Sequence, residues 1–174
     1  MRYMRNFIAS LAALLSLSAC YQLPPQMAPS PPAALVAAQN LSPEARHAAA
    51  PQWFDAHGNL IWPPNGGFAA APVPAVLPPG MLLDRFGSPG GTYFSPQATP
   101  YDMRALPYVC ETQAYTVYRV DRPLVANSGT AAPWFGEPGG AIQYQTGENA
   151  GQMLGDRTIG MLRDPGPAPC EAED

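Results

Sequence analysis

Ala-Tyr-Thr-Val-Tyr-Arg-Val, residues 114–120, is the stretch that decides the fold of this chain. β-branched and aromatic residues fill it, a composition that favours a strand half-buried in a sheet. Further extended runs lie on both sides, separated by glycine and proline turn signals, most clearly Gly87-Ser88-Pro89-Gly90-Gly91. The strands predicted in this way cover residues 60–62, 81–86, 93–94, 114–120, 142–144 and 158–162.

Helices are predicted to be few and short. Residues 148–154 show an amphipathic pattern that stops at Gly155, and Ser42 is placed to cap a helix of residues 43–48. The 23 prolines and 16 glycines disfavour long helices, and the Ala/Pro-rich residues 68–76 are predicted to be irregular. The expected fold class is therefore α+β and β-rich, a compact single domain of short antiparallel strands with few short helices.

Length and charge limit the functions that are open to the chain. Its 174 residues have room for one domain plus extensions. The formal net charge of −4 offers no basic surface for gripping phosphates, so we expect no nucleic acid partner. The two histidines, His47 and His57, have no ligand spacing, and the cysteines are far apart, so no metal site is expected either.

The N-terminus is predicted to be an export signal. Arg2 and Arg5 precede an apolar run over residues 7–17, and small residues then lead to Cys20. We expect a signal peptide over residues 1–19. Leu-Ser-Ala-Cys also resembles a bacterial lipobox, which would make Cys20 a lipidated first residue and anchor the protein at a membrane; the alternative is an ordinary signal peptide with an incidental cysteine. Either way the protein is expected to be exported, as an envelope lipoprotein or in secreted form.

Between this signal and the tail, the sequence divides into a tether and a domain. Residues 20–51 are rich in proline and alanine and are predicted to be a tether, and the domain is expected over residues 52–164. Cys110 and Cys170 are left as a pair that suits one disulfide in an oxidising compartment, the alternative being two free thiols. Such a disulfide would hold the tail, residues 165–174, against the domain.

Several segments carry a family resemblance in one order across roughly a hundred residues. Each is weak by itself, and their order and spacing together make the match specific. The chain resembles the TNT (tuberculosis necrotizing toxin) domain family in Trp-Pro-Pro-Asn-Gly-Gly-Phe at 62–68, in Leu-Pro-Pro-Gly-Met-Leu-Leu-Asp-Arg-Phe-Gly at 77–87, and in residues 91–96, 99–107, 115–124 and 132–144.

The resemblance implies an activity and three catalytic residues. Members of the family cleave NAD, and often NADP, to nicotinamide and ADP-ribose, so NAD is the substrate and no cofactor is expected. Arg85 matches the arginine of the Asp-Arg motif, Tyr93 the aromatic position after the glycine-rich turn, and Gln143 the glutamine before the last tyrosine. The cationic nicotinamide departs without a general acid, so the site must position the substrate and stabilise an oxocarbenium-like ribose.

Each assigned side chain has a structural alternative. Arg85 would grip the diphosphate, or form an ion pair with Asp84 or Asp102. Tyr93 would stack on nicotinamide or hold the ribose, or pack in the core, and Gln143 would contact the ribose, or only decorate its strand. The further candidates for substrate binding, which could equally serve the core or tie down a loop, are Phe86, Phe94, Arg104, Trp134 and Phe135.

The chain also departs from the family pattern. Glu137 stands where glutamine is common, Ala141 where glycine is common, and no histidine matches the one that some members place in the site. The main hypothesis is a secreted or surface-anchored NAD glycohydrolase that acts as a toxin or effector, with an immunity protein as a possible partner. The alternatives are a binding or structural lipoprotein without turnover, and an enzyme that transfers ADP-ribose to an acceptor.

Overall fold

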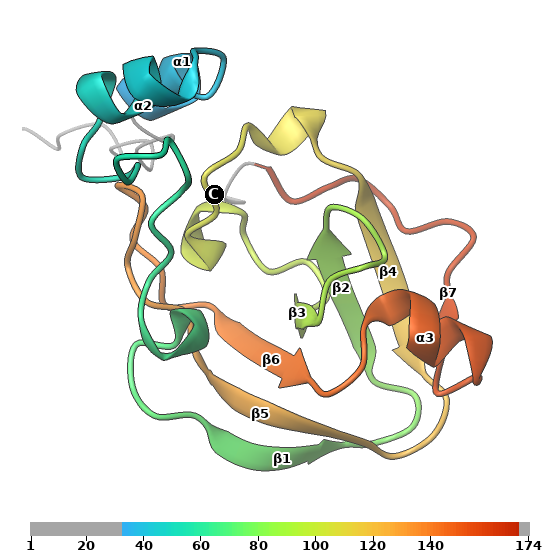
Figure 1. The fold of residues 1–174 in the computed structure, drawn as a ribbon. Coiled ribbons are helices and arrows are strands. Elements are labelled where there is room, and N and C mark those ends of the chain that lie inside the picture. Colours follow the sequence, from blue (N-terminus) through green and yellow to red (C-terminus); the bar gives the residue numbers. More distant parts are fainter. Residues whose placement is uncertain (1–32, 171–174) are drawn as a thin grey trace, which may run out of the picture.

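A computed structural model describes residues 33–170, so the predicted signal peptide and Cys20 lie outside the described residues. Seven antiparallel strands form one sheet in the order β1-β5-β6-β3-β2-β4-β7 (Figure 1). This agrees with the β-rich α+β class that the sequence predicts. The strands are β1 Val73–Leu77, β2 Leu82–Phe86, β3 Tyr93–Pro96, β4 Tyr115–Val120, β5 Leu124–Thr130, β6 Ile142–Thr146 and β7 Ile159–Met161.

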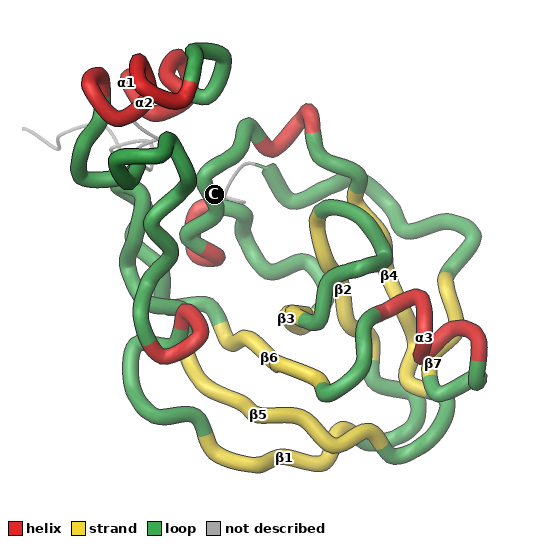
Figure 2. Tube along the Cα trace, viewed as in Figure 1, coloured by secondary structure: helices red, strands yellow, loops and turns green. Residues whose placement is uncertain are grey.

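The short strand β3 joins two halves of the sheet. Its residues Tyr93 and Phe94 pair with β6, whereas Ser95 and Pro96 pair with β2. Figure 2 shows β1, β5 and β6 as one group of strands and β2, β4 and β7 as another, with β3 between them. Side chains of β3 are therefore held at the junction of the two groups, next to the end of β2 that carries Arg85.

The helices are short, as expected. They are α1 Ala33–Ala38, α2 Pro43–Ala49 and α3 Ala150–Gly155, with single 3₁₀ turns at Asn65–Gly67, Asp102–Arg104 and Cys110–Thr112. Asn149 caps α3 in a reciprocal pair of hydrogen bonds with Gln152, which satisfies two of the free amides at the start of the helix. Among the described residues, no helix has the length and apolar character needed to cross a membrane.

The main core is formed by side chains of the sheet and of α3. Strand residues alternate between faces, so the inward set comes from six strands and from α3. Phe94 and Tyr118 meet in this core edge to face, with ring centroids 5.7 Å apart. The buried members are Leu77, Leu83, Phe94, Tyr118, Val120, Leu124, Ala126, Ala150, Met153 and Ile159.

Ordered structure begins upstream of residue 52, where we expected a tether to end. Ser42 caps α2 as predicted, but α1 and the residue that follows α2 also bury side chains. Leu35, Ala38 and Ala50 are buried in a second core cluster with Phe54 and Phe135. Sequence composition missed this because only three small or medium apolar side chains provide the contact. The partners they pack against lie up to a hundred residues away.

Three strand predictions need correction. Residues 73–77 form β1 inside the region predicted to be irregular, and Pro74 is tolerated because β1 is an edge strand, where one missing amide donor costs little. The long strand β5 was not predicted, since its second half, Asn127-Ser128-Gly129, is polar and flexible in composition. Residues 60–62 form no strand, and only Leu60 makes a single bridge, to Phe54.

The disulfide between Cys110 and Cys170 is present, with Cα atoms 5.5 Å apart. It brings the end of the described chain onto a third cluster of buried residues, formed with Phe86 and Tyr101. The backbone amide of Tyr101 also donates to the carbonyl of Pro169 at 3.0 Å. The tail is thus held against the segment that leads into the Asp102–Arg104 turn.

Candidate functional site

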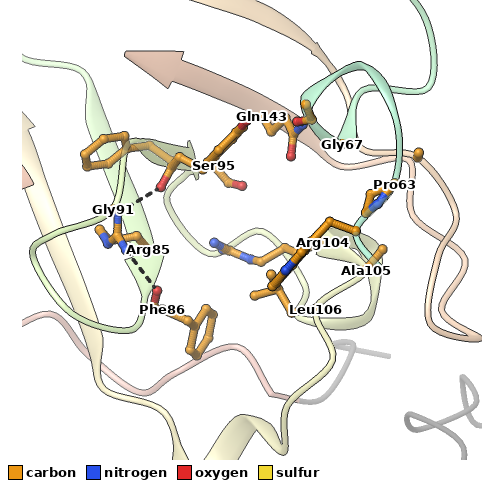
Figure 3. Close-up of a pocket in the computed structure, with 15 residues that line it drawn as sticks. Pro63, Gly67, Arg85, Phe86, Gly91, Ser95, Arg104, Ala105, Leu106 and Gln143 are labelled. Carbon is orange, nitrogen blue, oxygen red and sulfur yellow. Dashed lines mark hydrogen bonds between the residues drawn. The ribbon is translucent and has the colours of Figure 1, made fainter. Parts of the chain in front are cut away.

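A pocket of about 400 Å³ opens where β3 and β6 meet the loop before Phe68 and the turn after Asp102. All three residues that the sequence assigned to catalysis line it. Figure 3 shows Arg85 beside Gly91 in one part of the pocket and Gln143 beside Gly67 in another. The full lining is Trp62, Pro63, Gly66, Gly67, Arg85, Phe86, Gly91, Tyr93, Phe94, Ser95, Arg104, Ala105, Leu106, Ala132 and Gln143.

Arg85 is a buried cation, and only 8% of its surface is exposed. Its guanidinium donates long hydrogen bonds to the carbonyls of Tyr93 and Phe86, at 3.4 and 3.5 Å, and its Nε has no partner. Within residues 33–170 no carboxylate forms an ion pair with it, so the expected alternative of a pair with Asp84 or Asp102 is not what the structure shows. Burial lowers the pKa of Arg85, which marks an uncompensated charge that suits an anionic ligand.

The glycine-rich turn makes room for this guanidinium. A Cβ atom on Gly91 would lie 2.0 Å from Nη2 of Arg85 and 2.2 Å from Nη1. The guanidinium therefore lies directly over the Gly91 backbone, and any side chain there would push it away. Gly90 has no such contact, because a Cβ atom there would meet only Ser88 Oγ at 3.5 Å.

Arg104 lies in the same pocket, and its Nε and Nη2 have protein partners. Its Nη2 approaches Oδ1 of the buried Asp84 at 2.6 Å, and its Nε and Nη2 donate to the carbonyl of Thr99 at 3.1 and 2.7 Å. The guanidinium also lies 5.0 Å from the centre of the Phe86 ring. Of the two roles considered for Arg104, the contacts are those of a residue that ties the loop after Thr99 to the sheet.

Asp84 is the centre of this anchor. Its Oδ2 accepts from the Tyr115 hydroxyl and from the amide of Ala98, both at 2.9 Å. Burial raises the pKa of Asp84, and the charge of Arg104 opposes that shift. Burial and the neighbouring Asp84 also raise the pKa of Tyr115 to about 12, so its hydroxyl remains a donor. The cluster fixes the wall of the pocket that Ala105 and Leu106 provide.

Tyr93 and Gln143 reach the pocket from neighbouring strands. Tyr93 is paired across the strands with Gln145, two residues beyond Gln143, so all three side chains share one face. Gln143 Nε2 lies 3.5 Å from the carbonyl of Gly66, and a Cβ atom on Gly66 would lie 3.0 Å from the Tyr93 hydroxyl. Burial raises the pKa of Tyr93, which keeps the phenol neutral. Both polar groups thus remain available to a ligand.

The aromatic candidates divide into two groups. Phe86 and Phe94 line the pocket. Trp134 and Phe135 do not, which corrects their assignment to substrate binding. Phe135 is fully buried against Trp53, with ring centroids 5.5 Å apart, and Trp134 Nε1 donates to the carbonyl of Ile61 at 2.8 Å. Both residues hold the second core cluster together.

Sequence reasoning missed nine of the fifteen lining residues. Four of them, Trp62, Pro63, Gly66 and Gly67, come from the family segment at residues 62–68, which carries the resemblance but predicts no role for these residues. The adjacent glycines of this segment are a sequence signal that could have indicated a ligand-facing loop. The other lining residues that were missed are Gly91, Ser95, Ala105, Leu106 and Ala132.

Glu137 is a buried carboxyl that does not line the pocket. Only 3% of its surface is exposed, and among residues 33–170 neither carboxyl oxygen has a hydrogen-bond partner. Burial and the charge of Asp102 raise its pKa to about 7. Among the described residues, no group of three or more histidine, cysteine, aspartate or glutamate side chains could hold a metal ion.

The sequence profile of the family described as tuberculosis necrotizing toxin (TNT) matches residues 76–162, half of the chain. The chain belongs to the TNT family. The resemblance that the motifs carried is therefore confirmed. The matched region holds Arg85, Tyr93 and Gln143, whereas Trp62 and the glycines of the preceding loop lie outside it.

Individual relatives of this TNT-family chain include a fungal surface protein. The conidial surface nicotinamide adenine dinucleotide glycohydrolase nadA of Aspergillus fumigatus is 38% identical over 120 residues, or 62% of this chain. The chain spans about half the length of that curated relative, since the match covers 50% of it.

Two solved structures are similar at lower identity. Tuberculosis necrotizing toxin complexed with its immunity factor IFT matches 59% of this chain and 63% of the toxin chain, at 21% identity and a TM-score of 0.48. Tne2 in complex with Tni2 matches 64% of this chain and all of the other, at 17% identity and a TM-score of 0.44.

Proposed function

We propose that this protein hydrolyses the N-glycosidic bond of NAD, releasing nicotinamide and ADP-ribose. The observation that carries the proposal is Arg85, a buried cation without a carboxylate partner among residues 33–170, which lies in one pocket with Tyr93 and Gln143. Membership of the TNT family and the glycohydrolase from Aspergillus fumigatus support the same activity. NAD is then the substrate, NADP is a second possible substrate, and the reaction needs no cofactor.

In the proposed reaction Arg85 binds the diphosphate. A planar guanidinium matches paired phosphate oxygens, and binding would supply the counter-charge that Arg85 lacks. Phe94 keeps the guanidinium in place, with its ring centre 5.6 Å from the guanidinium carbon. Gly91 permits this position, because it leaves no side chain where the guanidinium lies.

Tyr93 and Gln143 position the nicotinamide ribose. The bond between the ribose C1′ and the pyridinium nitrogen breaks, and its electron pair neutralises the departing nicotinamide. A water oxygen then bonds to C1′ and releases a proton to solvent. The neutral Tyr93 phenol and the Gln143 amide orient the ribose and offer dipoles to the oxocarbenium-like transition state, without any proton transfer from either.

The cellular setting belongs to the proposal as well. Export is supported by the Cys110–Cys170 disulfide, since such bonds persist in oxidising compartments, and by the conidial surface location in the name of the fungal relative. We place the protein in the cell envelope or outside the cell, anchored through a lipidated Cys20, as a toxin or effector. An immunity protein is a proposed partner, by analogy with the complexed toxin.

Product analysis tests the proposal. The full chain is incubated with NAD, and nicotinamide and ADP-ribose are measured by chromatography, alongside Gln143→Ala and the control Gln145→Ala. Gln145 has the same side chain on the same strand face but does not line the pocket. We expect equal amounts of both products, a loss in Gln143→Ala and little change in Gln145→Ala. Binding of NAD without products would indicate a binding lipoprotein, and ADP-ribose on protein would indicate a transferase.

A further inference from the structure

A groove of about 540 Å³ lies next to the pocket. Trp62 lines both spaces, and the chain passes from Leu106 in the pocket wall to Tyr108 in the groove wall within two residues. Gln39, which directly follows α1, and Arg46 of α2 supply part of its wall. The groove is lined by Gln39, Arg46, Phe54, Gly58, Asn59, Leu60, Trp62 and Tyr108.

Trp62 is an exposed aromatic residue whose ring packs against a buried side chain. Some 52% of its surface is exposed, yet its ring meets the fully buried Phe135 at a centroid distance of 5.4 Å and an angle of 89°. The edge contact leaves a ring face free while it fixes the orientation of the ring. A rigid indole with an open face is the kind of surface on which a nucleobase stacks.

Hydrogen bonds fix the two segments that carry Gln39 and Arg46. Gln39 Nε2 donates to the carbonyl of Pro107, next to Tyr108, so α1 is tied to the chain that joins the pocket and the groove. Arg46 Nε donates to the carbonyl of Leu41 at 3.0 Å, and among residues 33–170 no carboxylate forms an ion pair with Arg46. The groove therefore combines an aromatic platform with an uncompensated positive charge.

We infer that this groove binds the adenosine half of the dinucleotide, with the purine stacked on Trp62. The inference rests on the proposed function and adds a subsite to it. A pocket of about 400 Å³ is near the lower end of the range of about 300–1,000 Å³ for sites of drug-sized ligands, and a dinucleotide is larger than such a ligand. The groove provides the remaining space where Trp62 continues the pocket.

This subsite is a property of the upstream part of the chain. Apart from Tyr108, all of its lining residues precede residue 76, where the match to the family profile begins. Residues 33–62, which were expected to be mostly tether, thus take part in substrate binding.

Kinetics of the full chain with two substrates test the inference. NAD is compared with nicotinamide mononucleotide, which has the same glycosidic bond and lacks adenosine. We expect Trp62→Ala to raise the KM for NAD about 5- to 100-fold, the effect typical of a lost base stack, and far more than the KM for the mononucleotide. Trp62→Phe should restore most of the loss. Ile61→Ala is the control, because Ile61 is exposed beside Trp62 and lines neither space. Equal losses for both substrates would overturn the inference.

A binding measurement separates this inference from the activity itself. Adenosine monophosphate is titrated into the full chain while tryptophan fluorescence is recorded, in wild type and in Trp62→Phe. Quenching that is lost in Trp62→Phe supports the subsite even if the wild type cleaves neither substrate, a result that would reject only the proposed hydrolysis. Absence of quenching, or quenching unchanged in Trp62→Phe, would overturn the subsite whatever the turnover.

Discussion

At the scale of single residues, the two arginines of the pocket differ in whether their charge is compensated. Arg104 is compensated by Asp84 and the Thr99 carbonyl, whereas Arg85 is buried with only two long contacts to carbonyls. A buried charge without a partner lowers the stability of the fold. Removing one member of a buried ion pair also lowers it, because the other member is then left as a buried charge without a partner. Substitution of the two residues should therefore separate function from stability.

Arg85→Met is expected to abolish most activity without lowering stability. Loss of a charge-assisted contact of about 1.5–3 kcal/mol corresponds to a fall in kcat/KM of about 10- to 100-fold. Removing an unpaired buried charge should leave the midpoint of urea unfolding unchanged or higher. Steady-state kinetics and urea titration measure both effects. A large drop in stability would mean that Arg85 has a structural partner after all.

Arg104→Met should lower stability, unlike Arg85→Met. It leaves the Asp84 carboxylate buried without its cation, which is expected to cost about 3–5 kcal/mol in the free energy of unfolding. Urea titration of the two methionine variants side by side provides the matched comparison, since the same side chain replaces both arginines. Equal stability of Arg104→Met and wild type would contradict the anchor role.

The raised pKa of Glu137 predicts that stability falls as the pH rises. Burial raises its pKa in the folded protein to about 7, above the ordinary value of 4.5, so the folded state binds this proton more tightly. The contribution of Glu137 to the free energy of unfolding is therefore greatest at low pH, and it is lost as the pH rises from about 4.5 through 7. Glu137→Gln, which introduces the residue common in the family, should be more stable than wild type at pH 8.

The same comparison at pH 4 provides the control for Glu137. The neutral carboxyl and the amide should then give similar unfolding midpoints, so the difference between wild type and Glu137→Gln grows with pH. Urea titrations of both proteins from pH 4 to pH 8 measure it. A difference that is constant across this range would rule out titration of Glu137 as its cause.

At the scale of elements, the turn between β2 and β3 controls the pocket through one glycine. Gly91→Ala places a methyl group where the Arg85 guanidinium lies, so we expect a fall in kcat/KM comparable to that of Arg85→Met. Gly90→Ala is the matched control, because its new methyl group meets only Ser88 Oγ, at ordinary contact distance. Circular dichroism checks that both variants fold. Full activity in Gly91→Ala would show that Arg85 can bind its ligand from another position.

The elements differ in how far the sequence determines them. β2, β3, β4, β6, β7, α2 and α3 follow from local signals. These are β-branched and aromatic runs, a glycine-rich turn, the Ser42 cap of α2 and the amphipathic pattern of α3. β1 and β5 pair with each other along their whole common length, and that tertiary pairing overrides the proline of one and the polar half of the other. Helix α1 depends on burial of Leu35 against distant residues, a contact that no local pattern announces.

At the scale of the molecule, the candidate site is assembled from segments far apart in the chain. The family motif located Arg85, Tyr93 and Gln143, because the motif itself records which residue types recur. It could not tell that Trp134 and Phe135 belong to the core, since an aromatic pair after a loop suits either role. Nor could it predict that Arg104 is neutralised by Asp84, because that requires the geometry of the loop after Thr99.

The disulfide should contribute to global stability. Cys110 and Cys170 are 60 residues apart in sequence, and a cross-link of such a span typically contributes about 2–4 kcal/mol by restricting the unfolded chain. A reducing agent is expected to lower the unfolding midpoint of the wild type. It should have no effect on the double variant Cys110→Ala/Cys170→Ala, which serves as the control. An unchanged midpoint after verified reduction of the wild type would show that the tail contributes little.

The most direct test of the central claim is the fluorescence of etheno-NAD incubated with the full chain, since cleavage of the nicotinamide bond relieves quenching of the etheno-adenine. Wild type, Gln145→Ala and Arg85→Met are compared at equal concentrations of folded protein. Wild type and Gln145→Ala should give a steady rise, and Arg85→Met a rate about 10- to 100-fold lower. No rise with folded wild type, or an equal rise with Arg85→Met, would contradict the proposed hydrolysis at this site.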